Sequence, residues 1–196
     1  MEKATYNIIL ASNSPRRKEL MSGLGIPFSV KVMQGIDEGY PSNLSPSDTA
    51  IYIAAEKADA YVLAEKDLII TADTIVVAGN DILGKPHDAE DAHAMLRKLS
   101  GKTHQVITGV CIKTREKQCS FAVTTDVTFK VLAQEEIEYY VNNYRPYDKA
   151  GAYGIQEWIG YVGVTSLKGS YFNVMGLPVQ RIYDVLKQEF GVSFLD

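Results

Sequence analysis

The segment "DLIITADTIVVAG", residues 67–79, constrains the fold more than any other part of the chain. A run of apolar and β-branched residues of this kind is typical of a strand buried in a sheet. The residues "GND", 79–81, have the composition of a hairpin turn, after which the chain would return through 81–86. The segment therefore predicts a buried strand followed by its hairpin partner.

Strands and helices are interspersed along the rest of the chain. Further strands are predicted at 6–11 and 28–33, in a long hairpin over 104–114 and 118–132, and once or twice within 161–176. Helices are predicted from Pro15 to Gly23 or Gly25, from Asp48 to Ala64 after a Ser47 cap, from Asp88 to Gly101, over 133–143, and from Pro178 to Phe190. This order favours an α/β fold with a mixed twisted sheet and flanking helices.

Length and charge limit the classes of function. The chain has 196 residues, of which 46% are hydrophobic, so we expect a single domain over residues 1–196, with or without a lobe. A net charge of −4 gives no global reason to bind nucleic acid or an anionic membrane, so any anion site must be local. Residues 1–9 lack the apolar stretch of a signal peptide, and no run approaches the length of a membrane span. We therefore expect a soluble, cytoplasmic protein.

The cysteines and histidines do not predict a metal centre. Cys111 and Cys119 flank the turn of the long hairpin and are placed to face each other, but a reducing compartment disfavours a disulfide. His87, His93 and His104 have no zinc-ligand spacing, either with each other or with the cysteines.

The stretch "LASNSPRRKELM", residues 10–21, predicts an unusual helix start. Ser14 suits the N-cap and Pro15 the first helical position. Arg16 and Arg17 then fall in the first turn, where the helix dipole disfavours each cation by roughly 0.3–1 kcal/mol. Either both are solvated surface arginines, or they share an anion such as a phosphate with the backbone N–H groups. The stretch lacks the glycine spacing and the Lys-Ser/Thr ending of a Walker A loop.

Acidic residues supply a second signal. Asp73 interrupts a strand, where a buried carboxylate is costly unless it is paired or bound to a metal. We expect it near a strand end as a metal ligand or general base, or else at a bulge or sheet edge. Glu38, with Asp37, lies in the loop "GIDEGYP", and would supply oxygen ligands for Mg²⁺ together with Asp73 if it is not simply solvated.

Lysine residues supply a third signal. Lys57 lies on a helical stripe with Ala50, Ala54, Ala58 and Tyr61, where a lysine either extends to water or reaches inward to an anion. Lys85 and Lys149 lie in glycine-containing segments that allow a ligand to approach the backbone closely. Cations, acids and glycine-rich loops without a Cys/His or Ser/His nucleophile pair suit metal-assisted hydrolysis of a phosphate anhydride, or binding of a nucleotide alone.

These segments match a known family. "LASNSPRRKELM", "AAEKADA", "TADTIVV", "LGKPHDAEDAHAMLRKLSGKTHQVITGV", "DKAGAYGIQ" and "GSYFNVMGLPV" resemble, in this order, the Maf family of nucleoside triphosphate pyrophosphatases. The resemblance implies hydrolysis to a nucleoside monophosphate and pyrophosphate with Mg²⁺ or Mn²⁺. It also implies an elongated, two-lobed Maf/ITPase-like fold with a central cleft that holds the site, in a chain that forms a homodimer.

The resemblance implies a role for each residue that matches a functional position of the family. Asp73 matches the catalytic proton acceptor, and Glu38 and Asp73 match the metal-holding acids. The resemblance places the following residues around the triphosphate: Ser12, Ser14, Arg16, Arg17, Lys57 and Lys85. Arg16, Thr74 and Gln156 match the positions that distinguish family members acting on dTTP and UTP from those acting on 7-methyl-GTP. An amide also suits the donor and acceptor edge of thymine or uracil.

Two other functions fit the same residues. One is a nucleotide-binding regulatory protein linked to septum formation, and the other is a purine-directed house-cleaning pyrophosphatase. The sequence does not select the physiological substrate among normal and modified pyrimidine nucleotides, nor the metal.

Overall fold

The structure, a computed structural model, describes residues 5–194, and these form two compact units. The first unit contains the described residues up to Asp73, with 108–123 and those from Gly176 onward. The second contains 74–107 and 124–175. Three strands, β3 (Asp67–Ala78), β5 (Thr103–Lys113) and β6 (Gln118–Phe129), contribute residues to both units.

The strands form one mixed sheet, as predicted. Its order is β2-β1-β3-β5-β6-β7, and β4 pairs with β3 beside this path. β1 (Asn7–Leu10) is parallel to β2 (Ser29–Val30) and to β3. β4 (Asp81–Leu83) is antiparallel to β3 through the predicted turn, and β7 (Val164–Lys168) is antiparallel to β6. The buried strand with its hairpin return is thereby confirmed.

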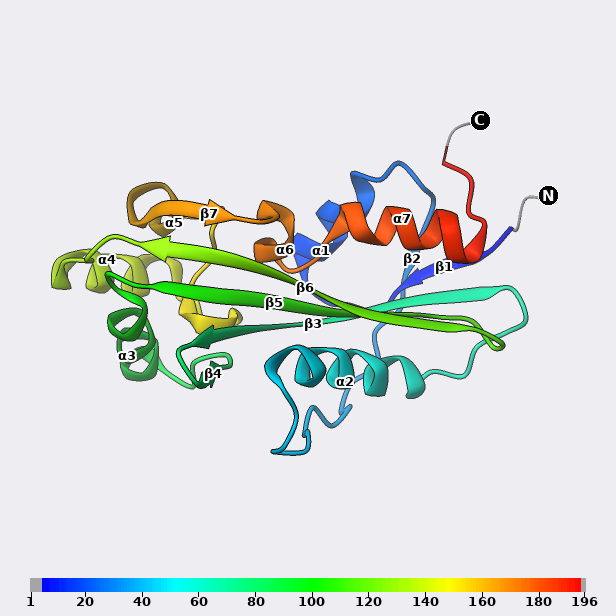
Figure 1. Cartoon of the computed structure of the whole chain (residues 1–196), viewed down its shortest axis with the longest axis horizontal. Coiled ribbons are helices and arrows are strands. Elements are labelled where there is room, and N and C mark those ends of the chain that lie inside the picture. Colours follow the sequence, from blue (N-terminus) through cyan, green and yellow to red (C-terminus); the bar gives the residue numbers. More distant parts are fainter. Residues whose placement is uncertain (1–4, 195–196) are drawn as a thin grey trace. The chain divides into compact units, whose positions relative to one another are not determined.

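Helices pack on both faces of the strands in the first unit. α2 (Pro46–Asp59) lies on one side, and α1 (Pro15–Ser22) and α7 (Val179–Phe190) lie on the other (Figure 1). On the α2 side, a core cluster joins one helix to three strands, with the following buried residues: Ile9, Ala54, Ala58, Tyr61, Ile69 and Cys111. The Thr71 hydroxyl donates to the Ala54 carbonyl at 2.6 Å, so α2 is also tied to β3 by a buried hydrogen bond.

The second unit contains shorter elements. α3 (Ala89–Leu99) packs against α4 (Gln134–Tyr144) and against the 3-10 turn η1 (Ala150–Ala152). α5 (Trp158–Gly163) and α6 (Tyr171–Met175) flank β7. His104, Phe129 and Tyr153 pack edge to face, with ring centroids 4.9 to 5.4 Å apart, and form an aromatic cluster in this unit.

Two predictions about elements need correction. α2 begins after Ser45, whose hydroxyl accepts from Asp48 N, so Ser47 is not the cap and the helix ends at Asp59. Only Ser29 and Val30 of the expected strand over 28–33 pair with a neighbour. The prediction of one or two strands within 161–176 is confirmed with one strand, β7, and most of the rest of that segment is helical. Such short helices depend on packing rather than on sequence periodicity.

Two other observations concern the cysteines and the length of the helices. Cys111 and Cys119 are both free, as expected. Within residues 5–194, no helix has the length and apolar character needed to cross a membrane.

Gly109 allows the close approach of β5 to α2. A Cβ built on this residue would lie 2.2 Å from the Ala50 carbonyl carbon and oxygen. Backbone atoms cannot yield as a flexible side chain would, so the helix must move if the glycine is replaced.

We predict that Gly109→Ala lowers the free energy of unfolding by about 1–3 kcal/mol, the range for overpacking a close contact. Urea unfolding measures this loss. Gly84→Ala is the control, because its added Cβ would meet no atom within 4 Å. Equal stability of the two variants would contradict the close approach.

Candidate active site

A lysine joins two acids in the first unit. Lys57 Nζ on α2 lies 2.8 Å from Glu38 Oε1 and 2.7 Å from Asp73 Oδ1. The side chains of Lys57 and Asp73 are 14% and 15% exposed, whereas that of Glu38 is 52% exposed. Lys57 therefore reaches inward to anions, and of the two orientations considered from the sequence, extension into water is wrong.

Asp73 lies in the middle of β3, not near a strand end. Residues 68–72 and 75–77 are buried, whereas Asp73 and Thr74 are only partly buried. The strand continues past Asp73, because the carboxylate is paired with Lys57 and keeps some contact with water, which offsets the cost of placing it there. The expectation of a strand end is therefore wrong. The alternative of a sheet edge holds locally, because β1 pairs with β3 only as far as Ile70 and β4 pairs with it only from Val76, and the Ala72 carbonyl between them accepts from Arg17.

The start of α1 has the predicted cap. Ser14 Oγ accepts from Arg17 N at 3.4 Å, and Pro15 occupies the first turn. Ser12 Oγ, in turn, accepts from Ser14 N at 3.2 Å, which orders the loop before the helix. The first turn holds no acidic residue, so its own side chains do not offset the unfavourable placement of Arg16 and Arg17 at the positive end of the dipole.

Arg17 also binds the backbone beside Asp73. Its Nε donates to the Gly176 carbonyl at 2.7 Å, and its Nη1 donates to the Ala72 carbonyl at 2.8 Å. Burial lowers the pKa of Arg17, whereas the negative charges of Asp73 and Glu38 raise it, so all three belong to one electrostatic group. Sequence reasoning predicted an anion-binding arginine but not this contact, because nothing local in the sequence signals a bond across 55 residues.

The other predicted residues belong to the second unit. Thr74 follows Asp73 in β3 and is partly buried, whereas Lys85 is exposed in the loop between β4 and α3. Gln156 follows η1, and its Oε1 is buried without a hydrogen-bond partner among the described residues. Lys149 is not open to a ligand, because it is 8% exposed and paired with Asp148 and Glu157.

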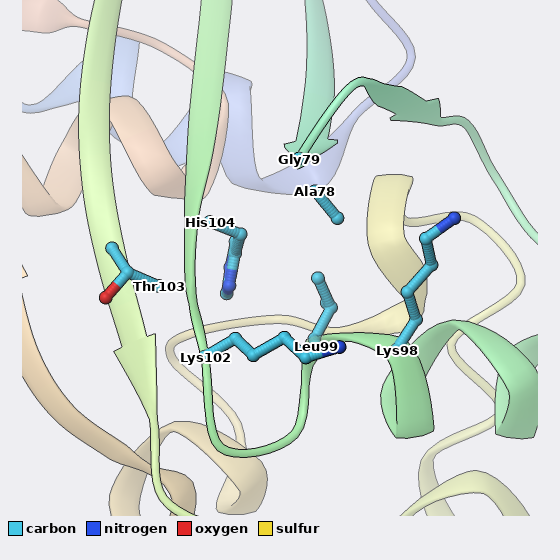
Figure 2. A pocket seen from close by; sticks show the side chains of 7 residues that line it. All are labelled: Ala78, Gly79, Lys98, Leu99, Lys102, Thr103 and His104. Atoms are coloured by element: carbon cyan, nitrogen blue, oxygen red, sulfur yellow. The ribbon is translucent and has the colours of Figure 1, made fainter.

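The second unit also contains a small cavity of about 160 Å³ that none of the predicted residues line. Figure 2 shows it beside Ala78 and Gly79 at the end of β3, with the side chains of His104, Lys98 and Lys102 around it. Lys98 pairs with Asp81, and a ring nitrogen of His104 lies 2.7 Å from the Tyr153 hydroxyl. The cavity thus has no lining residue in common with the group formed by Lys57, Glu38 and Asp73.

Residues 5–194 contain no group of three or more His, Cys, Asp or Glu side chains that converge as a ready metal cage. Glu38 and Asp73 converge as a pair on one ammonium group instead.

The fold and this cluster define a class: a mixed-sheet α/β protein with an acid–lysine–acid group in the same unit as an arginine-bearing helix start. The family follows from sequence comparison. The family model described as "Maf-like protein" matches residues 7–189, and the chain belongs to this family. The match runs through both units.

Curated relatives cover almost the whole chain. A dTTP/UTP pyrophosphatase of Phocaeicola vulgatus is 60% identical over 185 residues, which is 93% of this chain and 96% of the relative. Proteins of the same name from Bacteroides fragilis and Porphyromonas gingivalis are 58% and 54% identical, covering 93% and 96% of this chain and 96% of each relative. The crystal structure of a dITP/XTP pyrophosphatase from Mycobacterium abscessus has a TM-score of 0.40 and 16% identity over 63% of this chain and 74% of that chain.

We predict that Arg17→Lys lowers the free energy of unfolding by about 1–3 kcal/mol, because an ammonium group does not reproduce the planar fork that serves two carbonyls. Urea unfolding is the measurement. Arg115→Lys, in the exposed turn between β5 and β6, is the control and should change stability little. An unchanged midpoint for Arg17→Lys would show that the two carbonyl contacts contribute nothing.

His104 makes stability depend on pH. It is 2% exposed, and burial lowers its pKa from 6.5 to about 4. Between these values the unfolded chain binds more protons than the folded chain, so stability falls as the pH falls. We predict a loss of about 2 kcal/mol from this residue between pH 7 and pH 5.

The measurement is the free energy of unfolding at both pH values. His104→Gln should lose this part of the pH dependence, while His87→Gln, an exposed control, should keep it. The same pH dependence in His104→Gln as in the natural sequence would refute the assignment.

Proposed function

We propose that this protein is a nucleoside triphosphate pyrophosphatase that hydrolyses dTTP and UTP to the monophosphate and pyrophosphate. The observation that carries the proposal is the convergence of Glu38 and Asp73 on Lys57. The arginine-bearing start of α1 lies in the same unit. Relatives that are 54–60% identical and bear the name dTTP/UTP pyrophosphatase support it further.

The acidic pair fits a divalent metal. Both carboxylates lie within 2.8 Å of one cationic atom, so their oxygens are directed at a common point. Mg²⁺ and Mn²⁺ take oxygen ligands, and Mg²⁺ usually binds through one or two carboxylates with waters and substrate phosphates completing the shell. Glu38 and Asp73 would hold the metal, which would supply Lewis-acid stabilisation of charge on the phosphates.

Asp73 is the proposed general base. Its carboxylate would accept the proton of the attacking water, and Lys57 would orient it through the bond to Oδ1. Arg17 would fix the same carboxylate indirectly, because it holds the carbonyl of the preceding residue. Arg17 acts through the backbone and Lys57 binds Oδ1, so Oδ2 is the oxygen that would accept the proton from the water.

The proposed phosphate-binding residues are Ser12, Ser14, Arg16, Arg17, Lys57 and Lys85. In the first unit, the helix dipole of α1 and the two guanidinium groups would stabilise negative charge as the bond between the α- and β-phosphates breaks. A bound triphosphate would thus turn an unfavourable placement of two arginines into a favourable one.

Arg16, Thr74 and Gln156 are the proposed specificity residues. The buried Oε1 of Gln156 supports this role, because an amide oxygen that lacks a protein donor is suited to accept from a ligand. Thymine and uracil carry an N3–H donor beside a carbonyl acceptor, and a glutamine amide matches both. The homodimer implied by the family resemblance stays a prediction.

Product analysis after incubation with dTTP or UTP and Mg²⁺ tests the proposal. We expect dTMP or UMP with pyrophosphate. Release of orthophosphate and dTDP would refute the cleavage site, and tight binding without turnover would favour a regulatory role. Faster turnover of ITP than of dTTP would favour a purine-directed enzyme.

We predict that Asp73→Asn lowers kcat by roughly 100-fold or more, the usual contribution of a general base. Asp81→Asn is the matched control, since Asp81 is also a strand aspartate paired with a lysine but lies in the second unit. Undiminished turnover by Asp73→Asn would remove Asp73 from the role.

A further inference from the structure

A polar network in the second unit encloses the segment that carries Gln156. The Tyr140 hydroxyl on α4 donates to Glu157 Oε2 and accepts from Gly154 N at 3.0 Å. Tyr140 is fully buried, and burial and the Glu157 carboxylate raise the pKa of its phenol, so it stays protonated and able to donate. One side chain therefore holds the segment on both sides of Gln156.

A buried lysine completes the network. Lys149 Nζ lies 3.1 Å from Glu157 Oε1 and 2.8 Å from Asp148 Oδ1. Glu157 thus accepts from Tyr140 with one oxygen and from Lys149 with the other. Removing Lys149 would leave the partly buried Glu157 without its cation, and removing Glu157 would leave the buried Lys149 with Asp148 as its remaining ion-pair partner.

The backbone before Gln156 is held in an unfavourable conformation. Ala152 has a φ of 60°, in the left-handed region that a residue with a Cβ seldom adopts, whereas Gly151, with a φ of 69°, adopts this region readily. A Cβ on Gly151 would lie 2.9 Å from Val76 Cγ2. Contacts from the surrounding unit must impose this path, because the chain does not favour it locally.

Gln156 depends on this backbone for its own orientation. A Cβ on Gly154 would lie 3.0 Å from Gln156 Nε2 and from Lys149 Cε, and 3.1 Å from Glu157 Cδ, so all three side chains pack on this glycine. Gln156 Oε1 has no hydrogen bond to the described residues. Packing, rather than a bond of its own, therefore sets where the amide lies.

The position of that amide decides which base it selects. An amide oxygen that accepts from N3–H, with the amide nitrogen donating to O4, matches thymine and uracil. The same amide turned by half a rotation matches cytosine, whose N4 amino group donates and whose N3 accepts. Rotation about the last side-chain bond interchanges these two orders, so the amide discriminates between the pyrimidines only if its surroundings favour one order. Gln156 Nε2 packs on Gly154, so the placement of this segment bears on which order is favoured.

We propose that Tyr140 and Glu157 are positioning residues that fix the segment 154–157 and thereby make Gln156 selective for thymine and uracil over cytosine. This inference rests on the proposed function, in which Gln156 contacts the base. Neither residue is required to touch the nucleotide. They act through the backbone N–H of Gly154 and through the ion pair with Lys149.

The test is steady-state kinetics of Tyr140→Phe and Glu157→Gln with dTTP and with dCTP. We expect kcat for dTTP to change little, its KM to rise, and the ratio of kcat/KM for dTTP to that for dCTP to fall by roughly 3- to 10-fold, as for one weakened hydrogen bond. Glu157→Gln retains an acceptor for Tyr140 but loses the charge facing Lys149, so it provides an independent second variant.

Tyr61→Phe is the matched control. Tyr61 is also a buried tyrosine, and its hydroxyl accepts from Met33 N at 2.8 Å and donates to the Lys31 carbonyl at 3.2 Å, in the first unit. It should lose comparable stability in urea while keeping the dTTP-to-dCTP ratio. If Tyr140→Phe and Glu157→Gln behave in the same way as this control, their role is structural and the inference is wrong.

Gln156→Glu separates the inference from the proposed function. If it shifts the ratio while the two network variants do not, only the positioning role fails. If Gln156→Glu leaves the ratio unchanged, the proposed contact between Gln156 and the base is refuted. If the natural sequence hydrolyses neither nucleotide, the proposed function is refuted. In either case the inference about Tyr140 and Glu157 is refuted as well.

Discussion

The ion pairs of Lys57 are the interaction on which the candidate site depends. One ammonium group allows two carboxylates to lie close together on a partly buried surface, where their repulsion would otherwise be large. Asp73 lies in the middle of β3 and Lys57 lies on α2, which is bonded to β3. The positions of these two side chains are therefore fixed by the sheet and by the helix packed on it. Only Glu38 comes from a loop, and it is also the most exposed of the three.

Local sequence signals predicted the elements that carry this site. The apolar run at 67–79, the Ser14–Pro15 helix start and the helix predicted from Asp88 all have counterparts in the structure, where Asp88 is the N-cap of α3. The Ser45 cap of α2 could also have been predicted from the sequence, because Ser45–Pro46 repeats the pattern of Ser14–Pro15. By contrast, α5 and α6 have 6 and 5 residues and are too short to show a helical period.

Contacts between distant segments could not be predicted in the same way. The residue types at Lys57, Asp73 and Glu38 indicated acid and cation chemistry, but not that one lysine would bridge both acids. The carbonyl contacts of Arg17 and the Tyr140–Glu157–Lys149 network join segments that only the folded chain brings together. For these residues the sequence indicates which chemical groups are present, but only the folded structure shows which of them are in contact.

The division of the chain has a consequence for protein engineering. Each unit is assembled from separate stretches of sequence, and three of the four boundaries fall inside β3, β5 and β6, while the fourth follows α6. No single cut of the polypeptide releases either unit intact, and a cut after Asp73 would divide a hydrogen-bonded strand. Exchange of one unit between relatives would therefore require several crossover points, so gene fusion or truncation is a poor route to recombining their properties.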